Sequence, residues 1–85
     1  MRIREHPNKI IEGETTYTVR VCGTERGDGT WEGWLEFHPT NAAQGILRTD
    51  QETSQPNRGA LEYWADGLEP VYLEGALARA QCRLL

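Results

Sequence analysis

The sequence predicts a small α+β domain in which a three-stranded antiparallel meander is packed by one helix, in two layers. Two observations predict this fold class. Apolar residues alternate with polar ones along residues 16–22 and 30–38, and further along the chain they recur at helical spacing from Ala60 to Leu68. The 85 residues leave room for a single domain. We expect residues 14–85 to form it and residues 1–13 to be a loosely ordered N-terminal arm.

The strands are predicted from alternation and residue type. Residues 16–22 and 30–38 are rich in β-branched and aromatic residues, and they form a hairpin whose tip carries the turn dipeptide Asp28-Gly29. A third strand is predicted at residues 45–53, although its second half is polar. The arm has no clear period, and within it we expect at most a short strand at residues 9–12.

The helix is the element with the strongest pattern. Pro56 suits its first turn, and Thr53 or Ser54 lies just upstream as a cap. Gly67 ends it, with Leu68 placed for the hydrophobic contact that accompanies a glycine cap. Trp64 lies on its apolar face, so we expect this indole in the core.

Residues 69–85 fit two structures. Leu73, Ala76, Leu77, Ala80 and Leu84 have helical spacing, whereas alternation from Val71 also fits a strand, and Gly75 weakens a helix. The alanine content and the arginines near the end favour the helix.

Composition limits the function classes. Nine basic and thirteen acidic residues give a formal charge of −4, which is unfavourable for non-specific binding to phosphates. No apolar run approaches the ~20 residues that cross a bilayer, and no export leader is recognisable. We expect a cytoplasmic protein in which Cys22 and Cys82 remain reduced.

The segment 31–37 predicts a partner-binding surface. Trp31 shares one strand face with the apolar residues and is expected in the core, whereas Trp34 shares the other face with Glu32 and Glu36. Tyr63 lies off the apolar stripe of the helix. Exposed tryptophan and tyrosine are enriched at protein–protein hot spots. The four candidate partner-binding residues are Trp34, Glu32, Glu36 and Tyr63; packing of Trp34 under the arm or the C-terminal segment is the alternative.

Basic residues at the two ends suggest a second function class. If the termini lie close together, they form a basic patch for nucleic acid beside an acidic body. The candidate residues are Arg2, Arg4, Lys9, Arg79 and Arg83.

Catalytic and metal sites are less well supported. Asp50 and Glu52 are two residues apart, and on a strand they would share a face, which leaves a metal-dependent phosphodiesterase as a third alternative. The cysteines and the histidines, His6 and His38, show no paired ligand spacing. We therefore expect no metal, no cofactor and no catalytic residue.

The order of elements resembles the HicB-like antitoxin domain. The second strand ends in Phe37-His38-Pro39, a third strand runs into Thr49…Thr53, and Ala60-Leu61 opens the helix. The resemblance covers residues 16–67, but this chain has Pro39-Thr40-Asn41-Ala42-Ala43 where the family carries Pro-Asp-Leu-Pro-Gly. It implies a βββα core and binding to an RNA-cleaving toxin.

From the sequence we expect a binding module and not an enzyme. Its partner is a protein or a second copy of the chain, with toxin neutralisation as the version that the resemblance implies. An acidic inhibitor suits a basic enzyme.

Overall fold

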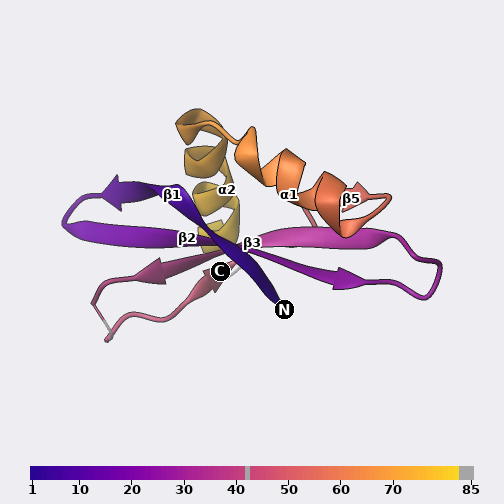
Figure 1. Cartoon of the computed structure of the whole chain (residues 1–85). Helices are drawn as coiled ribbons and strands as arrows, with labels where there is room; N and C mark the ends of the chain where they lie inside the picture. The colour runs from indigo at the N-terminus through magenta and orange to yellow at the C-terminus, as the bar shows by residue number, and fades with distance from the viewer. Residues whose placement is uncertain (42, 83–85) are drawn as a thin grey trace.

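A computed structural model describes residues 1–41 and 43–82 (Figure 1). Its strands form one antiparallel sheet, and both helices lie on the same side of that sheet (Figure 1). The α+β class is therefore confirmed, with more strands and a second helix than the minimal meander. In chain order the elements are β1 (Arg2–Glu12), β2 (Thr15–Glu25), β3 (Trp31–Pro39), β4 (Leu47–Arg48), β5 (Thr53–Gln55), α1 (Arg58–Asp66) and α2 (Pro70–Cys82).

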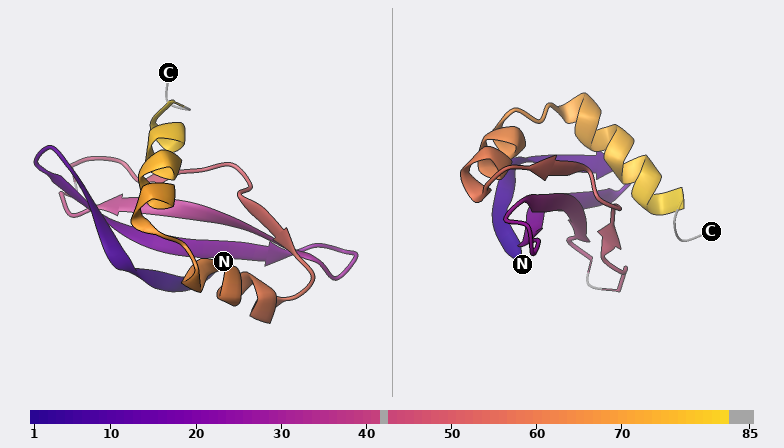
Figure 2. Two further views of the ribbon diagram at one scale, coloured as in Figure 1. Left: turned by 90° about the horizontal axis from the view of Figure 1, so that it is seen from above. Right: turned by 90° about the vertical axis from the view of Figure 1, so that its right-hand side faces the viewer.

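The predicted hairpin is the centre of the sheet. β2 pairs with β3 from Tyr17 to Glu25, and Val19 lies opposite Phe37 while Val21 lies opposite Leu35. These four side chains have no exposed surface and form the floor of the core. α2 crosses the strands above them, as Figure 2 shows, and its buried residues Leu73, Ala76, Leu77 and Ala80 complete the core.

The N-terminal residues form a strand, so the expectation of a loosely ordered arm is wrong. β1 runs antiparallel to β2 from Arg2 to Glu12. Its pairing register shifts twice, between Arg2 and Arg4 and between Glu5 and Lys9. Each shift moves the following side chains relative to the sheet faces, which is why the sequence shows no simple alternation there.

The third strand is divided into β4 and β5. Both pair with β3, β4 at Glu36 and Phe37 and β5 nearer to the β2–β3 hairpin tip. Between them, the buried hydroxyl of Thr49 accepts a hydrogen bond from the Leu35 N–H at 3.0 Å. The Thr49 hydroxyl thus takes the place of a backbone carbonyl as the acceptor for Leu35. The polar residues that follow leave the regular ladder, and strand pairing with β3 resumes at Thr53.

α1 begins at Arg58, two residues after Pro56, so Pro56 does not lie in its first turn. The cap is Asn57, whose Oδ1 accepts a hydrogen bond from the Ala60 N–H at 2.8 Å, so Thr53 and Ser54, which lie in β5, are not caps. Gly67 ends the helix in a right-handed conformation and donates to the Tyr63 and Trp64 carbonyls. Leu68 is buried, as predicted.

The C-terminal segment is helical, as favoured, and α2 begins at Pro70. Leu84 and Arg83 lie outside the described residues. In the part of the chain that the structure describes, no helix is long and apolar enough to cross a membrane.

Two facing glycines bring α1 onto the sheet. Gly23 of β2 lies opposite Gly33 of β3, and the buried side chain of Leu61 rests on both. A Cβ on Gly33 would lie 2.5 Å from Leu61 Cδ1, and one on Gly23 would lie 2.6 Å from Leu61 Cδ2. Larger residues would lift α1 away, so this pair sets the height of the helix above the sheet.

Candidate partner-binding groove

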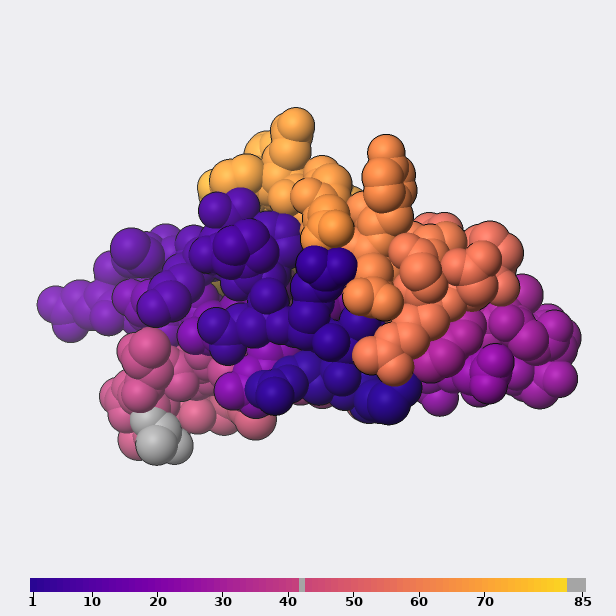
Figure 3. All heavy atoms as spheres, viewed as in Figure 1, coloured from indigo at the N-terminus to yellow at the C-terminus, as the bar shows by residue number. Residues whose placement is uncertain are grey.

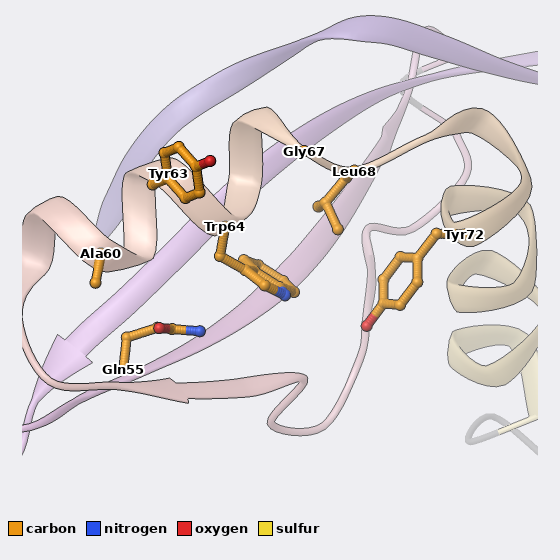
Figure 4. A pocket seen from close by; sticks show the side chains of 7 residues that line it. All are labelled: Gln55, Ala60, Tyr63, Trp64, Gly67, Leu68 and Tyr72. Atoms are coloured by element: carbon orange, nitrogen blue, oxygen red, sulfur yellow. The ribbon is translucent and has the colours of Figure 1, made fainter.

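An aromatic groove lies between α1, β5 and the first turn of α2 (Figure 4). Figure 3 shows side chains of α1 and of the start of α2 standing out from the surface with a hollow between them. The groove has a volume of about 710 Å³, within the ~300–1,000 Å³ of ligand pockets. It is lined by Gln55, Ala60, Tyr63, Trp64, Gly67, Leu68 and Tyr72.

The helical spacing of α1 puts two aromatic side chains at the groove. Leu61 and Ala65 point into the core and are fully buried. Trp64 lies at the edge of that apolar stripe: it packs against the core, as the sequence predicts, but it is only half-buried. Tyr63 lies off the stripe and is 82% exposed. An aromatic ring this exposed beside a half-buried indole is available for contact with another molecule.

Tyr72 forms the opposite wall of the groove. Its ring is perpendicular to that of Trp64, with 6.3 Å between the centroids. Its hydroxyl donates a hydrogen bond to Glu52, a carboxylate that also accepts one from Arg79. Burial, together with this hydrogen bond and the charge of Glu52, raises the pKa of Tyr72 to about 12. The hydrogen bonds between Tyr72, Glu52 and Arg79 therefore hold this wall of the groove in place before any ligand binds.

The residues that line the groove all belong to an acidic segment of the chain. Residues 52–74 contain five acidic residues and one basic residue, so their formal charge equals the −4 of the whole chain. Asp66 and Glu62 pair with Arg4, and Glu62 also pairs with Arg58. Glu69 and Glu74 are exposed and form no ion pair with the described residues; Glu69 directly follows the groove residue Leu68.

The structure separates the four predicted partner-binding residues. Tyr63 lies at the groove, whereas Trp34 and Glu36 lie on the helix-free face of the sheet. Trp34 is only 9% exposed and lies under the guanidinium of Arg48, and Glu36 Oε1 lies 2.9 Å from His38 Nε2. Burial opposes ionisation of Glu36, but its hydrogen bond with His38 contributes to keeping the pKa of Glu36 below its usual value.

Glu32 and Trp31 of β3 each lie next to an arginine. Glu32 pairs with Arg26 at 2.6 Å. Trp31, expected in the core, is only partly buried and lies beneath Arg58 at 5.9 Å. Of the three tryptophans, the one predicted to be on the polar face is therefore the most buried.

The four described basic residues of the two ends, Arg2, Arg4, Lys9 and Arg79, do not form one patch. Arg4 pairs with Asp66 of α1, and Arg79 pairs with Glu52. Arg2 and Lys9 are exposed at opposite ends of β1. Arg83 lies outside the described residues.

The residues considered for catalysis do not assemble into a metal centre. Among the described residues no three His, Cys, Asp or Glu side chains come together in a way that could hold a metal ion. Glu52 is bonded to Tyr72 and Arg79, and Asp50 lies between the two short strands. Burial raises the pKa of the Cys22 thiol to about 11, which keeps it protonated and unreactive.

Sequence reasoning found Tyr63 but missed the rest of the groove. The apolar helical spacing of Trp64 predicts its packing against the core but not its exposed edge in the groove. Tyr72 was not singled out, although it adjoins the apolar stripe of α2 that begins at Leu73. Trp64 and Tyr72 each lie at the edge of the apolar stripe of their helix, and this position is visible in the sequence. The groove itself, however, depends on how the two helices are placed relative to each other.

Comparison with known proteins adds no relative. No family model, no curated protein and no solved structure matches this chain. The resemblance to the HicB-like domain thus remains one of pattern, and function is argued from the geometry of the site.

Proposed function

We propose that this protein is a protein-binding module, and that the groove between α1 and α2 receives a side chain of its partner. The observation that carries the proposal is the 82% exposure of Tyr63 beside the half-buried rings of Trp64 and Tyr72. Tyrosine and tryptophan dominate the binding energy of protein interfaces because they contribute a large contact area with few rotatable bonds.

The charge distribution favours a protein over a nucleic acid at this site. The residues that line the groove belong to an acidic segment of the chain, residues 52–74, which is unfavourable for binding a phosphate backbone. Two of the basic residues proposed for nucleic acid, Arg4 and Arg79, are already paired with carboxylates. An acidic rim would instead attract a basic protein.

Two versions of the proposal differ in the partner. In one, the module neutralises a basic RNA-cleaving toxin, as the resemblance to the HicB-like domain implies. In the other, it associates with a second copy of itself. The cytoplasm, where the thiols stay reduced, is the compartment that we propose for either version.

Capture from native extract tests the proposal when it is combined with a groove variant. We expect the wild-type protein to retain one partner protein in stoichiometric amount, with or without nuclease, and Tyr63→Ala to lose it. Ile46→Ala is the matched control, since Ile46 is 58% exposed but does not line the groove. Both variants should unfold at the wild-type temperature, because each removes an exposed side chain.

Two results would contradict the proposal. Capture that disappears after nuclease treatment would indicate a nucleic-acid-associated module. Equal capture by wild type and Tyr63→Ala would place the interface elsewhere on the domain.

A further inference from the structure

We infer that the groove is a receptor for a cationic side chain, an arginine or lysine presented by a basic segment of another protein. This inference rests on the proposed function, and it adds the chemistry of the ligand. Three features of the described residues support it: the distribution of arginines over aromatic rings, the charge of the surrounding segment and the polar groups left open in the groove.

Arginine covers the other large aromatic rings at the surface of this fold. Arg48 lies 4.4 Å from the ring centroid of Trp34, and Arg58 lies 5.9 Å from that of Trp31. Arg79 lies 5.6 Å from the ring centroid of the groove residue Tyr72. A cation over an aromatic face is stabilised by the quadrupole of the ring.

The two remaining aromatic residues of the groove have no such cation. Among the described residues, no arginine or lysine lies over the ring of Tyr63 or Trp64. Both rings line the open space of the groove, and the perpendicular packing of Trp64 against Tyr72 gives it an aromatic corner. An incoming guanidinium or ammonium group could occupy this corner against a ring face.

The surroundings select a cation over other ligands. Glu69, adjacent in sequence to the groove residue Leu68, is exposed and forms no ion pair with the described residues. Its carboxylate is therefore available to pair with a partner's charge. The Gln55 amide donates to Thr53 through Nε2, and its Oε1 remains a candidate acceptor for a partner's N–H group. With its ion-pair partners Arg4 and Arg79 included, the segment of residues 52–74 has a formal charge of −2, which favours a basic ligand over an acidic one.

A second copy of the chain fits this site less well. Each copy would bring the same acidic segment, so two grooves facing each other would repel. A separate basic protein has no such penalty. We therefore assign the site to a basic segment of a different protein.

Selection from a random peptide library tests the inference without knowledge of the partner. Phage-displayed peptides would be panned on the wild-type protein and then counter-screened on Tyr63→Ala. We expect the Tyr63-dependent peptides to carry an arginine or lysine at one enriched position. Replacing that residue with methionine, which keeps an unbranched apolar chain, should weaken binding by about tenfold.

Charge variants of the protein provide a second readout. Glu69→Gln should weaken binding of the selected peptide by about threefold, and added salt should weaken binding to the wild type more than to Glu69→Gln. Glu14→Gln, which neutralises an exposed glutamate in the β1–β2 turn, should leave affinity unchanged. Tyr63→Phe should retain most of the affinity, since it keeps the ring.

The outcomes separate this inference from the proposed function. Tyr63-dependent peptides that are apolar or acidic would overturn the cation receptor and leave the binding module standing. Failure to obtain any Tyr63-dependent peptide would overturn both. Sedimentation of the protein alone is measured in parallel, and a dimer that dissociates in Tyr63→Ala would assign the groove to a second copy and overturn the inference.

Discussion

The guanidinium of Arg48 lies over the indole of Trp34, 4.4 Å from the ring centroid, on the face of the sheet that no helix covers. Arg48 belongs to the two-residue strand β4, which pairs with β3. Trp34 is 9% exposed although it does not belong to the main hydrophobic cluster. Its burial makes it a stabilising residue of the fold and not an available interface anchor.

Replacement of Trp34 should therefore destabilise the domain. We expect Trp34→Ala to lower the free energy of unfolding by about 3–5 kcal/mol, because a large buried ring is removed. Urea denaturation followed by circular dichroism measures this change. If the alanine variant does not fold, Trp34→Phe gives a smaller loss in the same direction. A melting temperature within a few degrees of wild type would instead restore Trp34 as an interface candidate.

The covering arginine can be tested separately. Arg48→Met keeps much of the aliphatic chain and removes the charge over the ring. We expect a loss of about 0.5–1 kcal/mol of unfolding free energy, as for exposed cation–π pairs. Arg2→Met is the comparison, since Arg2 is also exposed but lies over no aromatic ring of the described residues. An equal effect of the two variants would show that the stacking contributes nothing.

The sequence predicts which side chains of β3 face the core. It does not predict which residues cover the opposite face of the sheet. Alternation correctly placed Leu35 and Phe37 on the core side and Trp34 on the other. Trp34 is buried in the structure, and one residue over its ring is Arg48, which lies 14 positions away in a strand too short for a visible period. In β1, two register shifts conceal the alternation from which the strand would be recognised.

The candidate site was predictable only in part for a similar reason. Tyr63 departs from the apolar stripe of α1, and that departure is visible in the sequence. The groove, however, exists because α2 turns back across the sheet after Pro70 and brings Tyr72 opposite Trp64. Helix spacing indicates which face of each helix is apolar, but it does not indicate where two helices leave a gap.

The two cysteines should differ in reactivity. Cys82 is exposed, whereas Cys22 is buried and its pKa is raised to about 11. At about pH 8, iodoacetamide should modify Cys82 rapidly and Cys22 only after unfolding in guanidinium, because the thiolate is the nucleophile. Mass spectrometry of peptides at successive times measures both rates. Comparable rates in the folded protein would mean that Cys22 is accessible and ionised.

The close approach of α1 to the sheet at Gly33 should make this position intolerant of a side chain. We expect Gly33→Ala to lower the unfolding free energy by about 1–3 kcal/mol, since the added Cβ would lie 2.5 Å from Leu61 Cδ1 and 3.1 Å from Thr53 Cγ2. Gly27→Ala is the control, because a Cβ there meets nothing within 4 Å. Thermal and urea unfolding measure the two variants in parallel.

A double-mutant cycle assigns the cause of that loss. If the clash is with Leu61, shortening Leu61 to alanine should make the additional cost of Gly33→Ala smaller than in the wild-type background. Additive losses would show instead that strand propensity or the Thr53 contact accounts for the effect.

Glu52 should control the titration of Tyr72. Burial and the hydrogen bond to Glu52 raise the pKa of this phenol from its ordinary value of 10.0 to about 12. Because the folded pKa is the higher one, the associated stability is present below pH 10 and is lost as the pH rises toward 12. Glu52→Gln removes the negative charge, so the phenol should ionise at lower pH and stability should fall less over that interval. Phenolate absorbance measures the shift, and Tyr72→Phe identifies which tyrosine produces it. An unchanged titration in Glu52→Gln would mean that burial alone holds the proton on Tyr72 and that the carboxylate has no part in fixing the wall of the groove.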